Sequence, residues 1–346
     1  MCKCAGMYRL AFRLACALSL CLMSTPASAQ TGSTNPLMTK RLVDIGNGRR
    51  MNIVCIGSGS PTVLFEYGLG SHLLHWQKVQ QDVSALTTAC FYDRAGYGTS
   101  DPSPRSMTAQ NVTDDLYWLL DKAGVQKPFV LIGHSLGGLY ATLYADRFPS
   151  QVAGLVLIEP SFAGQDLGET AEEQHRSEKI FMAGQAESAR CGDLARQGKL
   201  SRANSAGCFM PSPGRTEAEI DYLAEQFFKP FRWDAMLSES RNLHATGALS
   251  EDEQEEQRAA ISYGDKPMIV LTAGVAPKLP EETEEEHDKN MAHWKAGHDR
   301  LAARSIRGKS IVVPNAGHMI QLDQPQAVID AVREVVLHVR TRQAEN

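Results

Sequence analysis

The chain has 346 residues and a formal net charge of −5, with 35 Lys and Arg against 40 Asp and Glu. A nucleic-acid-binding protein relies on a surplus of cations to neutralise phosphates, and this chain has none. A hydrophobic content of 43% and a charged content of 22% are ordinary for a globular protein with a sizeable core, and they exclude a disordered or collagen-like chain.

Residues 1–29 have the pattern of a signal peptide. Three cationic residues precede an apolar run over residues 14–23, an A-x-A site follows at residues 27–29, and we predict cleavage before Gln30. The apolar run is half the length of about 20 residues that a membrane span needs. We therefore predict a periplasmic or secreted protein with no stable membrane insertion after cleavage.

Strand-like runs alternate with helical patterns along the rest of the chain. Helical patterns cover residues 71–86, a stretch from Thr108 to a stop at Gly124, a stretch from Leu136, and the C-terminal residues 328–336. This alternation is typical of a mostly parallel sheet with helices on both faces. The strand-like runs are residues 40–45, 51–56, 62–67, 89–92, 129–133, 154–158, 268–272 and 310–313.

Residues 162–263 break the alternation, because polar helical pieces dominate and no strand pattern occurs. An insertion at the carboxyl end of a parallel strand lies over the edge of the sheet where ligands bind. We therefore predict a helical cap at residues 162–263, between two parts of a core at residues 30–161 and 264–346. Ser250 begins one cap helix with a capping box, and the acidic runs near Glu253 and at residues 281–286 are interpreted as solvated helix faces.

Four cysteines remain after cleavage, and an even number in an oxidising compartment is typical of disulfides. No C-x-x-C spacing indicates a metal site, and three pairings are possible. Cys191 and Cys208 lie 17 residues apart within the predicted cap, which favours their pairing. The other two cysteines are Cys55 and Cys90.

Residues 133–137 read Gly-His-Ser-Leu-Gly, a G-x-S-x-G pattern that follows a buried strand and precedes an amphipathic helix. In this context we predict that Ser135 is a nucleophile on a sharp strand-to-helix turn, rather than a simple helix cap. Glycines at positions 133, 137 and 138 would avoid collisions at the turn. The N-terminus of the helix would stabilise negative charge that develops beside the serine.

The sequence resembles the α/β-hydrolase superfamily of serine hydrolases over roughly residues 40–340. The resemblance rests on the G-x-S-x-G turn, on residues 93–100 (Asp-Arg-Ala-Gly-Tyr-Gly-Thr-Ser), and on Gly317-His318. It implies a mostly parallel, eight-stranded sheet with helices on both faces and a helical cap inserted after the sixth strand. In that fold the strands that carry Cys55 and Cys90 are neighbours, so the resemblance also implies a disulfide between them.

His318 is the predicted general base among ten histidines. It follows the last strand-like run, and its position agrees with the chain order of nucleophile, acid and histidine. The alternative is a histidine on a surface loop. We expect His134 to point away from Ser135, and we expect three histidines of a charged helical segment to face solvent: His287, His293 and His298.

The acid of the triad is assigned to Glu159. Relatives often carry the acid in the loop after the strand at residues 268–272, but no carboxylate occurs there before Glu281. Glu159 closes an apolar strand, where an unpaired carboxylate is costly, and some relatives place the acid at this strand end. The alternatives are Glu281, Glu282 and Asp265.

An oxyanion needs N–H donors. The backbone of Leu136, directly after the nucleophile, is one expected donor. The resemblance implies that Leu69 supplies the second, because relatives carry a His-Gly pair where this chain has Tyr67-Gly68. Leu69, Trp76 and Met319 are candidates to line an acyl pocket, and each could equally be part of the core.

The sequence therefore predicts an exported serine hydrolase that cleaves carboxylic esters through an acyl-enzyme, acting on a small-molecule ester-like substrate with no metal or organic cofactor. A serine at the turn argues against epoxide or haloalkane hydrolysis, which the fold performs with an aspartate. Hydrolysis of lactones, amides or peptides, or C–C bonds would use the same triad. A binding protein without activity on the same scaffold is a remote alternative.

Overall fold

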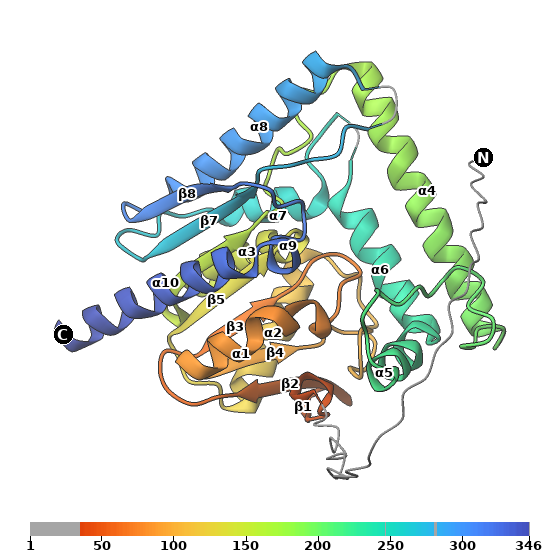
Figure 1. Ribbon diagram of the computed structural model, residues 1–346, viewed down its shortest axis with the longest axis horizontal. Helices are drawn as coiled ribbons and strands as arrows, with labels where there is room; N and C mark the ends of the chain where they lie inside the picture. The colour runs from red at the N-terminus through yellow and green to blue at the C-terminus, as the bar shows by residue number, and fades with distance from the viewer. Residues whose placement is uncertain (1–34, 246, 280–281, 346) are drawn as a thin grey trace, which may run out of the picture. The chain divides into compact units, whose positions relative to one another are not determined.

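A sheet of eight strands runs through the computed structural model, which describes residues 35–245, 247–279 and 282–345 (Figure 1). The predicted signal peptide and Glu281 lie outside the described residues. The strand order is β1-β2-β4-β3-β5-β6-β7-β8; β1 and β4 pair with β2 antiparallel, and every other pairing is parallel. The strands are β1 Leu42–Gly46, β2 Arg49–Ile56, β3 Val63–Glu66, β4 Ala89–Tyr92, β5 Phe129–His134, β6 Val152–Ile158, β7 Met268–Ala273 and β8 Gly308–Val313.

Helices cover both faces of the sheet, and the predicted α/β class is confirmed. The helical pattern at residues 71–86 forms a short 3-10 helix followed by α1. The α-helices are α1 Gln77–Leu86, α2 Ala109–Ala123, α3 Leu136–Arg147, α4 Ala171–Arg196, α5 Glu217–Phe227, α6 Pro230–Leu243, α7 Glu251–Ala259, α8 Glu284–Ala302, α9 Ile320–Asp323 and α10 Pro325–Glu345, and the 3-10 helices are η1 Pro36–Met38, η2 Leu73–Trp76 and η3 Pro149–Gln151.

Two apolar clusters, one on each side of the sheet, form the core. Side chains alternate between the two faces of a strand, so Val63 and Phe65 of β3 join α1 and α10, while Leu64 joins α2, α3 and α8. Strands β5 and β7 are buried along their whole length, as expected for central parallel strands covered on both faces. In the part of the chain that the structure describes, no helix is long and apolar enough to cross a bilayer.

Helices α4 to α7 form the cap between β6 and β7, and no strand interrupts the described residues of this insertion. Helix α6 packs along α4, and α7 packs on α3 of the core. Figure 1 shows α4 and α6 side by side at one end of the sheet. The cap therefore contacts the core through α7, through apolar side chains of α5, and through the side chains of α6 described below.

The acidic face of α7 is buried, where we expected solvated carboxylates. Asp252 accepts a hydrogen bond from the Ala109 N–H at 2.6 Å, and Glu253 closes the predicted capping box with Ser250. Glu256 pairs with Arg304 at 2.8 Å. Because α7 packs against α2 and α3, its carboxylates are needed as acceptors and ion-pair partners inside the protein.

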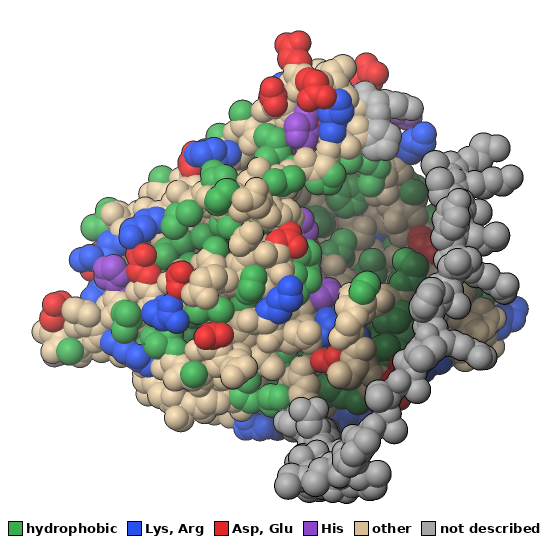
Figure 2. All heavy atoms as spheres, viewed as in Figure 1, with side chains coloured by type: hydrophobic (Ala, Val, Ile, Leu, Met, Phe, Trp, Pro, Cys, Tyr) green, Lys and Arg blue, Asp and Glu red, His purple; other side chains and the backbone are tan. Residues whose placement is uncertain are grey.

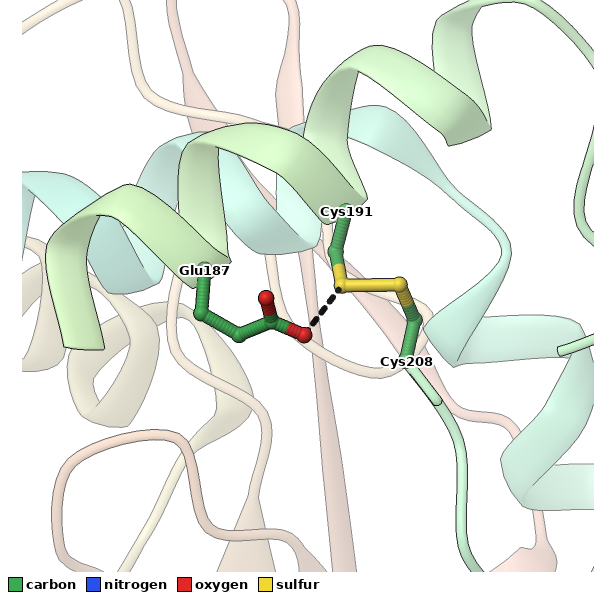
Figure 3. A group of neighbouring side chains, drawn as sticks. All are labelled: Glu187, Cys191 and Cys208. Atoms are coloured by element: carbon green, nitrogen blue, oxygen red, sulfur yellow. Dashed lines mark hydrogen bonds between the residues drawn. A yellow bond between two sulfur atoms is a disulfide. The ribbon is translucent and has the colours of Figure 1, made fainter. Parts of the chain in front are cut away.

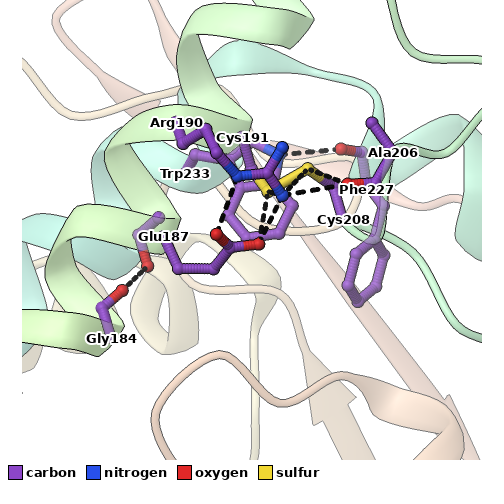
Figure 4. Close-up of a disulfide and its surroundings, with 9 residues drawn as sticks. Gly184, Glu187, Arg190, Cys191, Ala206, Cys208, Phe227 and Trp233 are labelled. Atoms are coloured by element: carbon purple, nitrogen blue, oxygen red, sulfur yellow. Dashed lines mark hydrogen bonds and ion pairs between the residues drawn. A yellow bond between two sulfur atoms is a disulfide. The ribbon is translucent and has the colours of Figure 1, made fainter. Parts of the chain in front are cut away.

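The structure contains the two expected disulfides, Cys55–Cys90 between β2 and β4 and Cys191–Cys208 within the cap. Figure 4 shows the second bond beside the side chains of Arg190 and Trp233. The Glu187 carboxylate approaches Cys191 Sγ, and the three side chains bring possible metal-ligand atoms together (Figure 3). The two sulfurs are bonded to each other and offer no thiolate, so this group is a structural cross-link.

Candidate active site

Ser135 stands on the turn that joins β5 to α3. Its dihedral angles, φ 54° and ψ −128°, lie outside the regions that are favourable for residues with a side chain. The turn is held by its backbone, because the Ser135 N–H donates to Ile158 O at 3.1 Å and the Ser135 carbonyl accepts from the Gly138 N–H at 2.7 Å. The strain is therefore imposed by the packing of β5, β6 and α3 around the turn.

The glycines around Ser135 are required by close backbone approach, as predicted. A Cβ atom on Gly133 would lie 2.5 Å from the Gly137 carbonyl oxygen, and one on Gly137 would lie 2.6 Å from the Tyr67 carbonyl oxygen. Contacts this short cannot be relieved without moving the backbone. The start of α3 is therefore pressed against the end of β3.

Two backbone N–H groups beside Ser135 have no partner among the described residues of the protein. Gly68 packs directly on the serine, since a Cβ atom on Gly68 would lie 2.9 Å from Ser135 Cβ. Leu69 is the next residue, and Leu136 occupies the first position of α3, where an N–H has no intrahelical acceptor. In the described part of the chain, neither N–H donates to a protein acceptor. Such donors can hold a developing oxyanion.

His318 lies in the loop after β8, and His134 anchors that loop. The His134 and His318 ring centroids are 4.9 Å apart, and His134 Nε2 lies 2.9 Å from the His318 carbonyl oxygen. Burial lowers the pKa of His134 to about 3, so its ring is neutral at pH 7 and donates the Nε2 proton to this carbonyl. The residue before the serine thus fixes the backbone of the predicted base.

The His318 side chain is exposed and makes no hydrogen bond to Ser135 Oγ within the described residues. Desolvation by neighbouring atoms lowers the pKa of the His318 imidazole below its ordinary value. The ring is therefore unprotonated at pH 7 and able to accept a proton. An exposed side chain changes rotamer within nanoseconds, so the ring has freedom to turn.

Glu159 follows β6 with φ 48°, and its side chain is only 7% exposed. Its Oε2 accepts from the Ala273 N–H at 2.6 Å, and its Oε1 accepts from the Trp294 indole N–H at 2.8 Å. Burial raises the pKa of this carboxyl to about 7. No hydrogen bond or ion pair joins Glu159 to His318 among the described residues. The structure thus leaves Glu159 without a cationic partner.

His298 is fully buried, which shows that the expected exposure was wrong. Burial lowers the pKa of His298 to about 4, so the ring is neutral. Its Nε2 donates to the Pro160 carbonyl at 3.0 Å, and its Nδ1 accepts from Thr272 Oγ1 at 2.7 Å. Trp294 and His298 lie one turn apart on the inner face of α8, where they hold Glu159 and the residue after it. Because α8 is rich in charged residues, its sequence shows no clear apolar pattern that would have predicted this inner face.

Of the other described candidate acids, Glu282 lines a cavity together with Glu159, whereas Asp265 lies at the far end of β7. Asp265 precedes β7 at the amino end of that strand, opposite to the edge that carries Ser135, and forms an ion pair with Arg342 at 2.9 Å. Glu282 accepts from the Leu279 N–H at 2.7 Å and from Asn290 at 3.1 Å. Together with His287 Nδ1 at 3.3 Å, these contacts tie Glu282 to its own loop and to the first turns of α8.

A cavity of about 430 Å³ opens beside Glu159 and Trp294, between α8 and the loop that contains Leu167. Ser135 and His318 do not line it. Figure 2 shows a recess with hydrophobic side chains on the side of the molecule where α4 and α6 lie. Of the proposed pocket-lining residues, Trp76 is wholly buried in the core, whereas Leu69 and Met319 are half-buried.

Sequence analysis assigned no role to Arg94 and Glu66, which form a buried ion pair at 2.6 Å below the Gly68 loop. Each of the two residues has a sequence feature that could have indicated a role. Arg94 belongs to the motif at residues 93–100, and Glu66 closes an apolar strand in the same way as Glu159. Their cap partner Glu239, in contrast, has no distinguishing pattern around it.

The raised pKa of Glu159 predicts a pH-dependent stability. A carboxyl whose pKa rises from 4.5 in the unfolded chain to about 7 in the folded protein stabilises the fold at low pH, and this contribution is lost as the pH rises through 7. Relative to Glu159→Gln, which cannot titrate, the unfolding free energy of the wild type should fall by about 3 kcal/mol from pH 4.5 to above pH 7. Urea denaturation of both proteins across this range measures the difference, and a constant difference would contradict it.

Comparison with known proteins agrees with the fold. Residues 67–331 match the sequence model of the alpha/beta hydrolase family. Uncharacterized protein YqjL of Bacillus subtilis is 30% identical over 280 residues, which cover 81% of this chain and 85% of that protein. A haloalkane dehalogenase loop variant from Bradyrhizobium elkanii has the same fold, with a TM-score of 0.65 and 20% identity over 89% of this chain and 98% of that one. A thermophilic esterase from Thermogutta terrifontis gives a TM-score of 0.54 and 18% identity over 87% of this chain and 99% of that one. The chain belongs to the alpha/beta hydrolase family.

Proposed function

We propose that the protein is an exported serine hydrolase that cleaves carboxylic esters. The observation that carries the proposal is the strained Ser135 turn with two unpaired N–H groups, those of Leu69 and Leu136, beside it. Strain of this kind costs about 1–3 kcal/mol and persists where the surrounding structure enforces it, often at active sites. A serine that served only to cap α3 would accept a hydrogen bond from the helix, and the Ser135 side chain accepts none.

In the proposed reaction, His318 takes the proton of Ser135 Oγ as this oxygen attacks the ester carbonyl carbon. The carbonyl oxygen becomes an oxyanion, held by the N–H groups of Leu69 and Leu136. The bond from carbon to the leaving alcohol then breaks, and His318 returns its proton to the alcohol oxygen. An acyl group remains on Ser135. Water, deprotonated by His318, attacks this acyl group and releases the carboxylic acid as the proton returns to Ser135.

The His318 side chain must turn toward Ser135 for this chemistry. Catalytic hydrogen bonds are often long or misaligned without substrate, and we expect the bond between Ser135 and His318 to form when substrate binds. Because the His318 side chain is exposed, it has room to rotate. The hydrogen bond from His134 holds the His318 backbone, so the movement is confined to the side chain. The lowered pKa of His318 keeps the ring in the base form at pH 7.

Glu159 is proposed to orient His318 and to stabilise its imidazolium form. Its two N–H donors, from Ala273 and Trp294, favour the ionised carboxylate. They do not cancel the cost of burial, which leaves the pKa of Glu159 near 7. An imidazolium nearby would supply the missing positive charge at the step where His318 holds the proton.

Lactones, amides and C–C bonds flanked by carbonyls would pass through the same acyl-enzyme, so they remain alternatives within this mechanism. A dehalogenase or an epoxide hydrolase, as some structural neighbours are named, would require a carboxylate nucleophile where this chain has Ser135. A binding protein without activity would have no use for the strained serine.

A fluorophosphonate probe should label the mature protein at Ser135, because the N–H groups that hold an oxyanion also bind a phosphoryl oxygen. Ser135→Ala should abolish labelling and ester hydrolysis. His318→Ala should lower kcat by about four orders of magnitude, as for other members of such triads. Gel fluorescence and mass mapping of the labelled peptide check the site. Labelling that persists in Ser135→Ala would refute the assignment.

Glu159→Gln should lower kcat/KM for a p-nitrophenyl ester by about 10²–10⁴-fold, because loss of the charge leaves the imidazolium unsupported. Glu282→Gln serves as the matched control, and we expect less than about threefold change, since that carboxylate is occupied by Leu279, Asn290 and His287. The pH profile of the wild type should rise through an apparent pKa near 7 as Glu159 ionises. The reverse ranking of the two variants would move the acid to the later loop.

Export is proposed from the pattern of residues 1–29 and is compatible with the two disulfides. Full-length protein expressed in a bacterium with an outer membrane should be recovered from the periplasmic fraction beginning at Gln30, with all four mature cysteines oxidised. Intact-mass analysis and thiol labelling check both points. Protein retained in the cytoplasm with Met1 and free thiols would contradict export.

A further inference from the structure

The Arg94 guanidinium uses all five of its N–H donors below the Gly68 loop, and Arg94 is only 1% exposed. Nε donates to Glu239 Oε1 at 2.7 Å, and Nη2 donates to Glu239 Oε2 at 3.1 Å. Nη1 donates to Glu66 Oε1 at 2.6 Å and also to the Tyr67 carbonyl. The remaining Nη2 hydrogen goes to the Gly68 carbonyl at 3.0 Å. The side chain is thus locked in one orientation.

The bond to the Gly68 carbonyl has a consequence for Leu69. The Gly68 C=O and the Leu69 N–H belong to one planar trans peptide, in which the two groups point in opposite directions. When Arg94 holds the carbonyl oxygen toward the interior, the Leu69 N–H must point the other way. Gly68 packs on Ser135, so the direction of this N–H is set directly beside the serine.

Helix α6 of the cap completes the arrangement. Glu239 and Arg232 lie seven residues apart on α6, two turns of helix, and therefore on one face. Arg232 Nη2 donates to the Gly70 carbonyl at 2.6 Å, and Tyr97 Oη donates to Glu239 Oε2 at 2.6 Å. Arg94 thus holds the Gly68 carbonyl, and Arg232 holds the Gly70 carbonyl, so both sides of Leu69 are fixed. Arg94 is held in turn by Glu239 of α6.

Stability alone is a weak reason for this cluster. Buried ionic groups pay for desolvation, and apolar side chains of similar volume are often as stabilising or more so. What apolar side chains cannot do is aim a peptide group by binding its carbonyl. All five N–H donors of the planar Arg94 guanidinium are engaged, which suits a role in fixing the direction of a peptide group.

Resting on the proposed function, we propose that Arg94 is a positioning residue for the oxyanion site: it aims the Leu69 N–H at the substrate carbonyl oxygen, and Glu239 of the cap helix α6 keeps it in place. Arg94 does not touch the substrate. The position of the cap helix α6 and the direction of the Leu69 N–H are therefore coupled. A displacement of α6 would misalign this donor.

The experiment compares a carboxylic ester with its thionoester, in which sulfur replaces the carbonyl oxygen. Sulfur is a weak hydrogen-bond acceptor, so hydrolysis of the thionoester depends little on the aim of the donor. Loss of one oxyanion donor costs about 10²–10³-fold in kcat, so Arg94→Lys should lower kcat for the ester by about 100-fold. Its kcat for the thionoester should fall by less than about fivefold, with KM for both substrates little changed.

Glu239→Gln is the second variant, because it preserves side-chain volume while one Arg94 N–H loses its acceptor. We expect kcat to fall about tenfold for the ester and to stay unchanged for the thionoester. Thermal denaturation shows whether Arg94→Lys folds, and if it does not, Glu239→Gln alone provides the test. Tyr97→Phe is the matched control: it removes one bond to Glu239, leaves the bonds of Arg94 intact, and should keep the wild-type ratio of ester to thionoester rates.

A folded variant that loses the same factor on both substrates would overturn the positioning role, since a general disturbance does not distinguish oxygen from sulfur. Failure of the proposed function gives a different result. In that case the wild type would cleave neither substrate and would not be labelled at Ser135.

Discussion

The candidate site depends on the close approach of three backbones around Ser135. Strand β5, the start of α3 and the Gly68 loop meet where side chains are absent, and Cβ atoms at Gly68 or Gly137 would collide with their neighbours. This contact forces the serine into its strained conformation and brings the Leu69 and Leu136 N–H groups beside it. The central sheet supplies the rigidity, because β3, β5 and β6 each pair with a strand on both sides and are buried along almost their whole length.

Burial has a second effect at the same edge of the sheet, which is to keep titratable groups uncharged. Low dielectric surroundings lower the pKa of His134 to about 3 and that of His298 to about 4, so both rings act as fixed hydrogen-bonding groups at neutral pH. His134 then holds the loop of His318, and His298 holds Pro160 beside Glu159. Structural histidines of this kind position the groups that are proposed to react.

The sheet, the cap and Ser135 could be predicted from sequence because each has a local pattern. Buried parallel strands are continuous apolar runs, and the G-x-S-x-G turn shows its strand and helix directly. The burial of His298 and of the α7 carboxylates could not be predicted, because it depends on which helix face packs inward. In helices rich in charge such as α7 and α8, apolar periodicity is too weak to mark that face. The partner of Arg94 lies 145 residues away in the chain, and only the fold brings Glu239 to it.

Two glutamates that close apolar strands show how the surroundings divide the roles of identical side chains. Glu66 ends β3 and forms an ion pair with Arg94 while accepting a hydrogen bond from Tyr92, so a permanent cation already opposes its charge even though burial raises its pKa. Glu159 follows β6 and, among the described residues, accepts from two neutral N–H donors, which leaves its negative charge poorly compensated. A buried carboxylate without a cation gains most from a positive charge that forms nearby. Of the two, therefore, Glu159 is the one whose environment is suited to a transient imidazolium, whereas Glu66 is suited to hold a permanent guanidinium in place.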